Sequence, residues 1–198
     1  MKFFKSKKNT EEKIKEATFE VLASNGFAGV SMREIAKKAQ TAVGQLTYYY
    51  GTKENLIVSV IDEMINEFLK ELEEYMSGAE DKLSAIISFY EELFEKESKV
   101  FRVLIDFVAQ SLWNPVYKEK IKEFFDKTVE LIKEAYIQKG MDEENAKKEA
   151  ELLMAIICGK VMQNALETEC ETDKIKRKYR ILEKGRLLFN VKAANNLL

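Results

Sequence analysis

Residues 31–56 read SMREIAKKAQTAVGQLTYYYGTKENL, and this stretch decides the fold. Ser31 begins a short helix, because its hydroxyl can accept a hydrogen bond from the backbone N–H of Glu34 while the Glu34 side chain reaches back. Apolar side chains then recur at helical spacing as far as residue 39. After a turn, a second short helix begins within about a residue of Val43 and runs to about Tyr49. Two helices this short and this close predict a helix-turn-helix, whose second helix enters the major groove of DNA.

The flanking sequence adds one helix before this motif and a long one after it. Thr10 is the expected N-cap of the first helix, and Gly26 is its stop signal. Three helices therefore occupy residues 10–50. From Thr52 onward, apolar residues keep a helical period to about Met76, which predicts a rod on the order of 35 Å long.

The same period predicts five further helices, which makes the chain all-α with nine helices, three followed by six. Pro115 suits the first turn of a helix and Gly140 suits a helix end. The five helices are expected at about 80–97, 98–113, 115–139, 142–168 and 173–191.

Composition agrees with a folded helical protein and excludes several kinds of catalytic site. Of 198 residues, 46% are hydrophobic and 33% are charged, and there is a single proline. The chain has no histidine, which excludes His-dependent triads, His-ligated zinc and the Glu-x-x-His di-iron bundle. It also has no P-loop or glycine-rich dinucleotide fingerprint. We therefore expect neither an enzyme nor a metal or cofactor site.

The start of the chain and its cysteines indicate a cytoplasmic protein. The opening residues, MKFFKSKKN, lack the apolar run of a signal peptide. No stretch approaches the roughly 18 apolar residues of a membrane span. Cys158 and Cys170 are too few for a disulfide framework, so we expect both to be reduced.

Charge is distributed unevenly along the chain. Residues 1–56 hold ten Lys or Arg and six Asp or Glu, whereas the whole chain has a net charge of −2. A basic N-terminal part on an acidic body fits one end that faces nucleic acid. The lysines among the first eight residues form either a phosphate-seeking arm or a solubilising tail.

The ordered motifs from residue 14 to residue 56 resemble those of the tetracycline-repressor (TetR) family of bacterial transcription regulators. They are Ile14-x-x-Ala17, Gly26-Phe27, Ser31-x-x-x-Ile35-Ala36-x-x-Ala39, Gly44-x-Leu46-x-Tyr48-x-Tyr50 and Lys53-Glu54-x-Leu56. The resemblance implies a helix-turn-helix DNA-binding domain over residues 1–52 with a basic arm. It implies a larger six-helix domain over 53–198 for ligand binding and dimerisation. The expected function is a repressor that a small, mostly hydrophobic effector releases from a palindromic operator.

The turn of the motif departs from the family pattern. The family favours Ala-Gly-Val-Ser where this chain has Ala39-Gln40-Thr41-Ala42. If the left-handed turn is kept, Gln40 costs on the order of 1 kcal/mol relative to glycine. Ala42 has no side chain that can cap the recognition helix, although Thr41 has one.

Carried over position by position, the resemblance places Gln45 for base reading, since its amide can pair bidentately with adenine. It places Tyr48, Tyr49 and Lys53 at phosphates. Packing is the alternative role for each tyrosine, and it is the expected one for Tyr50. The full set of expected DNA contacts is Ser31, Thr41, Ala42, Val43, Gly44, Gln45, Thr47, Tyr48, Tyr49 and Lys53.

One three-helix unit covers few base pairs, so we expect a two-fold homodimer. The resemblance assigns the dimer surface to the last two helices, at Leu153, Ile157, Val161, Ala165, Ile175, Tyr179, Leu182 and Phe189. The aromatic middle helices suit a pocket for an apolar or aromatic effector, with core packing as the alternative. The expected pocket residues are Phe89, Phe94, Phe101, Phe107, Gln110, Trp113, Phe125, Met154 and Cys158.

Two other functions fit the same residues. One is a DNA-binding activator or nucleoid-type protein without an effector. The other is a helical interaction protein whose helix-turn-helix has lost DNA binding through the altered turn at residues 40–42.

Overall fold

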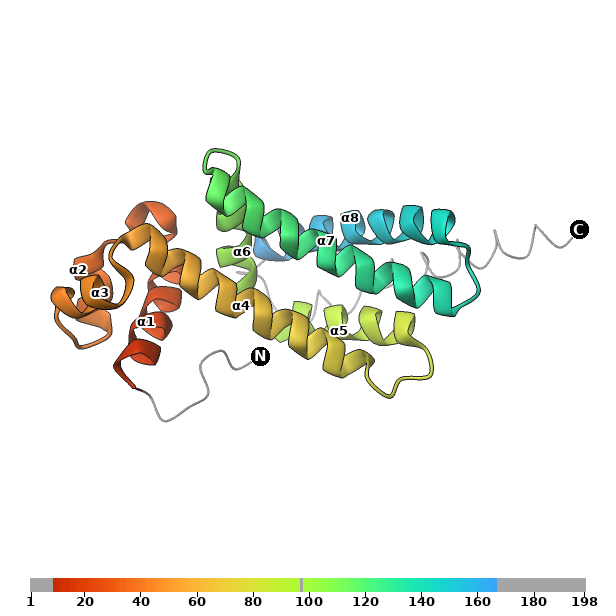
Figure 1. The fold of residues 1–198 in the computed structure, drawn as a ribbon, viewed down its shortest axis with the longest axis horizontal. Coiled ribbons are helices and arrows are strands. Elements are labelled where there is room, and N and C mark those ends of the chain that lie inside the picture. The colour runs from red at the N-terminus through yellow and green to blue at the C-terminus, as the bar shows by residue number, and fades with distance from the viewer. Residues whose placement is uncertain (1–8, 97, 167–198) are drawn as a thin grey trace, which may run out of the picture. The chain divides into compact units, whose positions relative to one another are not determined.

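The computed structural model describes residues 9–96 and 98–166, and all regular structure in this part of the chain is helical. Its elements are α1 (Thr10–Asn25), the 3-10 helix η1 (Phe27–Gly29), α2 (Met32–Lys38), α3 (Val43–Tyr50), α4 (Lys53–Met76), α5 (Lys82–Lys96), α6 (Ser98–Ser111), α7 (Pro115–Gln138) and α8 (Glu143–Leu166) (Figure 1). The predicted all-α fold is confirmed, and eight of the nine predicted helices are present. The ninth, at 173–191, lies outside the described residues.

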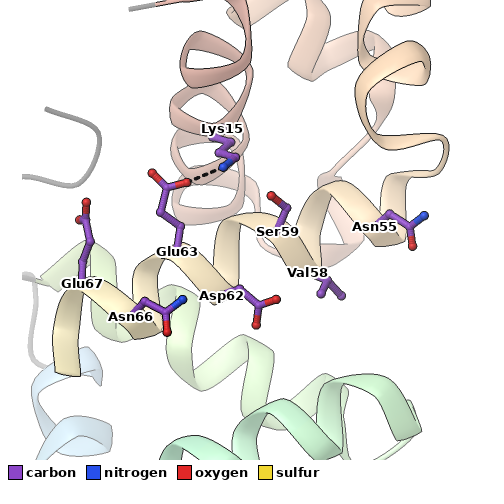
Figure 2. Close-up of a pocket in the computed structure, with 8 residues that line it drawn as sticks. All are labelled: Lys15, Asn55, Val58, Ser59, Asp62, Glu63, Asn66 and Glu67. Atoms are coloured by element: carbon purple, nitrogen blue, oxygen red, sulfur yellow. Dashed lines mark ion pairs between the residues drawn. The ribbon is translucent and has the colours of Figure 1, made fainter. Parts of the chain in front are cut away.

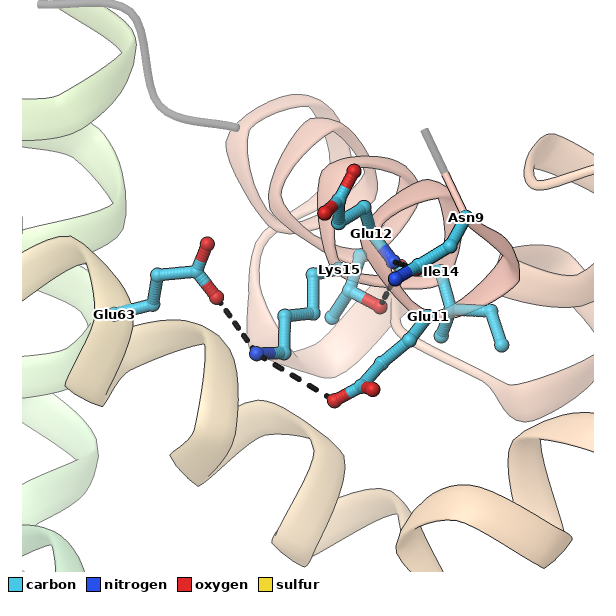
Figure 3. A network of polar contacts seen from close by, with 7 residues as sticks. Asn9, Glu11, Glu12, Ile14, Lys15 and Glu63 are labelled. Atoms are coloured by element: carbon cyan, nitrogen blue, oxygen red, sulfur yellow. Dashed lines mark hydrogen bonds and ion pairs between the residues drawn. The ribbon is translucent and has the colours of Figure 1, made fainter. Parts of the chain in front are cut away.

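The first helix begins one residue earlier than the sequence predicted. Asn9, not Thr10, is the N-cap, because its backbone is extended and its Oδ1 accepts from the backbone N of Glu12 at 2.9 Å. One turn further on, Lys15 extends from α1 toward α4, and its Nζ lies 2.8 Å from an oxygen of Glu63 (Figure 3). The start of α1 is therefore capped locally and tied to α4 by an ion pair.

Helix α4 connects the three-helix unit to the rest of the described chain. Its 24 residues make a rod about 36 Å long at 1.5 Å per residue. It packs against α1 and α3 near its start and also against α5 and α7 (Figure 1). Its apolar face is buried from Leu56 to Met76 and belongs to a core that also includes Ile14, Ile35 and Leu46.

The predicted domain boundary at residue 52 falls at Thr52, the N-cap of α4, whose hydroxyl accepts from the N–H of Asn55 at 3.1 Å. The described residues up to 165 nevertheless group as one compact unit. The division into domains at 52 stays a prediction.

The turn after α1 is fastened to α6. The backbone N–H of Phe27 donates to Oδ2 of Asp106 at 2.7 Å, and the Phe27 ring stacks on Phe107 with centroids 6.0 Å apart. Gly26 has a φ of 64°, and a Cβ there would lie 3.0 Å from the same Asp106 oxygen. A second link joins Lys99 of α6 to Glu20 of α1. Helix α6 thus contacts the three-helix unit through polar and aromatic groups.

Candidate nucleic-acid interface and apolar pocket

The turn between α2 and α3 keeps the left-handed backbone despite its unusual sequence. Gln40 has a φ of 54° and is the one described residue other than glycine with a positive φ. The backbone N–H of Thr41 donates to the carbonyl of Ala36 at 3.0 Å, which closes the end of α2. Because this geometry favours glycine, the predicted cost of about 1 kcal/mol applies to Gln40.

Helix α3 begins at Val43 without a side-chain cap. Ala42 is the N-cap and makes no side-chain hydrogen bond. The hydroxyl of Thr41 lies one residue too early to take that role and donates instead to Oε1 of Gln45 at 2.7 Å. The Gln45 amide is therefore held by its neighbour, which orients the side chain before any ligand binds.

Helix α3 turns almost all of its side chains to solvent. Leu46 is its one fully buried residue, with 0% exposure, whereas Tyr48 is 84% exposed and Tyr49 is 45% exposed. Tyr50 is only partly exposed and packs against the core. Its buried hydroxyl has no hydrogen-bond partner, and burial raises its pKa. Tyr50 thus packs against the core, whereas the other two tyrosines remain exposed.

The remaining predicted contacts lie on or beside α3. Ser31 caps α2 by accepting from the N–H of Glu34 at 3.2 Å, and its side chain remains exposed. Gly44 is exposed and has open space where a Cβ would stand. Lys53 lies in the first turn of α4, with its Nζ 3.4 Å from the carbonyl of Val30. Of the ten predicted residues, Thr41 and Lys53 are half-buried and the other eight are exposed.

A polar groove between α1 and α4 carries more acidic than basic side chains. It is lined by Lys15, Asn55, Val58, Ser59, Asp62, Glu63, Asn66 and Glu67 (Figure 2). Its carboxylates are engaged, since Glu63 pairs with Lys15, and Asp62 lies 3.0 Å from Lys120 of α7. Three carboxylates disfavour a phosphate backbone here, so this groove is not part of the candidate DNA surface.

A separate cavity of about 300 Å³ lies beside α6 and α8. Its lining is Phe68, Tyr90, Phe101, Leu104, Ile105, Val108, Ala109, Phe124, Phe125, Met154, Ile157, Cys158, Val161 and Met162. Ala109 and Met162 are exposed and therefore lie at the rim. Five lining residues come from α6, the helix whose Asp106 holds the turn after α1.

The structure brings together some of the predicted pocket residues and disperses the others. Phe101, Phe125, Met154 and Cys158 line the cavity. Phe89, Phe94 and Phe107 do not line it and are buried in the core. Gln110 is half-buried outside the lining, and Trp113 is 86% exposed in the turn after α6.

Sequence reasoning missed most of the α6 contribution because it followed the aromatic residues. Leu104, Ile105 and Val108 form a second apolar stripe on α6, beside the one that contains Phe107. Two stripes on one helix indicate two apolar neighbours. That signal was available in the sequence, although it does not say which neighbour is a cavity.

Helix α8 also differs from the prediction. Leu153, Ile157 and Val161 are only 7 to 8% exposed and belong to the chain's own core, while Ala165 is half-buried. The large apolar side chains that α8 exposes are Leu152 at 49%, Ile156 at 40%, Met162 at 58% and Leu166 at 87%. Helix α8 is apolar on both faces, so counting apolar positions does not show which face is free. The other predicted dimer residues, Ile175, Tyr179, Leu182 and Phe189, lie outside the described residues.

No helix among the described residues is both long enough and apolar enough to cross a membrane.

Comparison with known proteins finds a family match in the N-terminal part of the chain. Residues 14–60 match the model of the bacterial regulatory proteins of the tetR family. The chain is 32% identical over 87 residues to the fatty acid metabolism regulator protein of Bacillus subtilis, across 42% of this chain and 45% of that protein. The chain thus spans less than half the length of this relative.

Solved structures extend the likeness in fold over most of the described chain. A TetR transcriptional regulator from Legionella pneumophila matches with a TM-score of 0.72 at 19% identity, over 82% of this chain and 90% of that one. A regulator from Saccharomonospora viridis in complex with choline matches with a TM-score of 0.71 at 16% identity, over 77% and 83% of the two chains. The family match thus covers the helix-turn-helix, and the solved structures show that most of the described chain has the fold of TetR regulators.

Proposed function

We propose that this protein is a sequence-specific, DNA-binding transcriptional regulator, and not an enzyme, that acts in the cytoplasm. It is a repressor that binds a palindromic operator as a homodimer and is released by a small, mostly hydrophobic effector. The observation that carries the proposal is helix α3. One buried leucine anchors this helix, while Gln45, Thr47, Tyr48 and Tyr49 are exposed to solvent.

The chemistry of these exposed residues suits a DNA duplex. The amide of Gln45, oriented by Thr41, matches the donor and acceptor that adenine presents in the major groove. The hydroxyls of Tyr48 and Tyr49 and the ammonium of Lys53 suit phosphate oxygens. Gly44 leaves room for the backbone of α3 to approach the duplex closely.

The dimer in this proposal uses the outward face of α8. Leu152 and Ile156, one turn apart, expose apolar surface on one helix, and such a face is stabilised by burial against a second copy. A two-fold dimer of this kind carries two α3 helices, which must lie about 34–36 Å apart to enter successive major grooves.

Helix α6 provides the route from effector to DNA. One side of α6 lines the cavity, and its Asp106 and Phe107 hold the turn that follows α1. An effector that favours a shifted position of α6 therefore favours a shifted three-helix unit, and operator affinity falls as that form becomes populated. Helix α4, packed against both α1 and α7, moves with it.

Selection of bound sites from random duplexes, followed by fluorescence anisotropy, tests the DNA-binding proposal. We expect a palindromic site. Gln45→Ala should lower the preference at one base pair by roughly 1–3 kcal/mol and leave the other positions unchanged. Lys53→Ala should weaken all sequences alike and reduce the slope of log K against log salt by about 0.9, which is one phosphate contact.

The matched control for Lys53 is Lys70→Ala, because Lys70 lies on the same helix with a side chain 75% exposed. This control should change neither affinity nor salt slope. Purified protein that selects no sequence, and binds no duplex at low salt, would refute the proposal.

A further inference from the structure

Among the described residues, the wall of the cavity beside α6 contains no charged side chain. None of its fourteen lining residues is Asp, Glu, Lys or Arg. Burial raises the pKa of the Cys158 thiol and of the Tyr90 hydroxyl, so both groups are neutral near pH 7. An ion that enters the cavity loses hydration and meets no counter-charge on the described wall, which is strongly unfavourable.

The cavity also offers few hydrogen bonds. Tyr90 has the one hydroxyl among the lining residues, and its Oη is buried without a hydrogen-bond partner. A buried hydroxyl that lacks a partner is destabilising, so a ligand that carries a single polar group can satisfy it. A ligand with several polar groups would leave most of them unpaired.

Five aromatic rings in the wall raise the possibility of a cationic ligand, since ring faces attract quaternary ammonium groups. Several of these rings are already engaged with one another. Phe68 packs edge to face against Phe124, with centroids 5.3 Å apart, and lies 5.9 Å from Tyr90. Phe124 lies 5.6 Å from Phe125. Because no described lining residue is a carboxylate that could neutralise a cation, these rings favour a hydrocarbon ligand over a cationic one.

We propose that this cavity, taken as the effector site of the proposed function, binds an uncharged and largely hydrocarbon ligand with one polar group, and discriminates against anions and cations of the same shape. At about 300 Å³, it is at the small end of the range for ligand pockets, which suits a single medium-length chain or a small ring system.

Three ligands with the same ten-carbon chain test the charge rule. Isothermal titration calorimetry on the full chain compares decanol, decanoate and decyltrimethylammonium below the concentrations at which they form micelles. Decanol should bind at least tenfold more tightly than either ion. Octanol should bind more weakly than decanol by about fourfold for each missing methylene, because each buried methylene contributes about 0.8 kcal/mol. An ion that binds as tightly as decanol overturns the proposal.

Filling the rim locates the binding site. Ala109→Trp places a large ring at an exposed lining position and should weaken decanol binding at least tenfold. The matched control is Ser88→Trp, because Ser88 is an exposed helical residue outside the lining. Met162→Trp repeats the test from α8. Circular dichroism shows which variants fold, and undiminished decanol binding in the folded rim variants overturns the proposal.

Parallel anisotropy measurements on the selected operator distinguish this inference from the proposed function. If decanol binds in the cavity and operator affinity does not change, the ligand class stands and the effector-release function fails. If decanoate or decyltrimethylammonium instead occupies the cavity and releases the operator, the function stands and the neutral-ligand inference fails.

Discussion

Helices α3 and α6 are both short, and they differ in how their side chains are used. Of the eight residues of α3, Leu46 alone is fully buried. Helix α6 has apolar residues on two sides, one in the core and one along the cavity. The comparison shows why one candidate site is readable from a motif and the other is not. Exposed side chains that packing does not require point to a partner, whereas apolar side chains fit both a core and a pocket.

The same substitution in the two helices should have unequal effects on stability. Leu46→Ala removes a side chain that is fully buried, and we expect a loss of about 2–5 kcal/mol in the free energy of unfolding. Leu104→Ala removes a half-buried side chain that borders the cavity. Its loss should be roughly 1 kcal/mol, because one side of Leu104 already lacks packing partners.

Chemical denaturation measures both values, with unchanged m-values as the sign that the same transition is observed. Equal losses at the two positions would mean that the cavity is closed in solution, and the contrast between α3 and α6 would disappear.

The link between the two regions can be broken at Asp106. Asp106→Ala removes the acceptor of the Phe27 N–H and leaves that partly buried donor without its partner. We expect a stability loss of about 1–3 kcal/mol. Decanol should still bind to this variant but should lower its operator affinity much less than in the parent protein.

Asp106→Asn is the matched control, since its carbonyl oxygen can still accept from Phe27. This variant should retain most of the ligand effect on operator binding. If the alanine variant responds to decanol as fully as the asparagine variant, the coupling does not pass through this hydrogen bond.

The smallest expected effect concerns the turn that precedes α3. Gln40→Gly relieves a left-handed conformation at φ 54°, and it should raise the free energy of unfolding by about 0.5–1 kcal/mol after the greater freedom of glycine in the unfolded chain is included. Lys37→Gly, at an exposed position inside α2, should lower stability by about 1 kcal/mol. Thermal unfolding shows whether each variant is more or less stable than the parent protein. The affinity for decanol should change in neither variant. A loss of stability in Gln40→Gly would show that Gln40 makes a compensating contact.

Much of the fold could be predicted from the sequence. Helix boundaries agree with the structure to within a few residues, because starts and stops depend on local groups. Ser31 caps α2 as expected, and the one misplaced cap, Thr10 for Asn9, reflects two adjacent residues that are both suitable N-caps. The left-handed turn at Gln40 was considered only on the condition that the chain keeps the turn of the family it resembles, and the structure shows that it is kept.

The pocket was predicted less well, for a physical reason. Phe125 and Phe107 are equally apolar, but the first lines the cavity and the second stacks on Phe27. Trp113, the largest apolar side chain, lies in the solvent-exposed turn after α6. Which aromatic residue meets empty space depends on how helices distant in sequence pack together, and periodicity along one helix does not contain that information.

Whereas the outward-facing side chains of α3 were expected from the family resemblance, local sequence was sufficient for the order and type of the helices and for the helix-turn-helix. These features depend on hydrogen bonds and contacts within a few residues of each other. Only the tertiary packing decided that α6 faces a cavity on one side and holds Phe27 of η1 through Asp106, and that α8 turns Leu153 inward and Leu152 outward. An apolar helix face is compatible with several partners, and the partner is chosen only when distant segments come together.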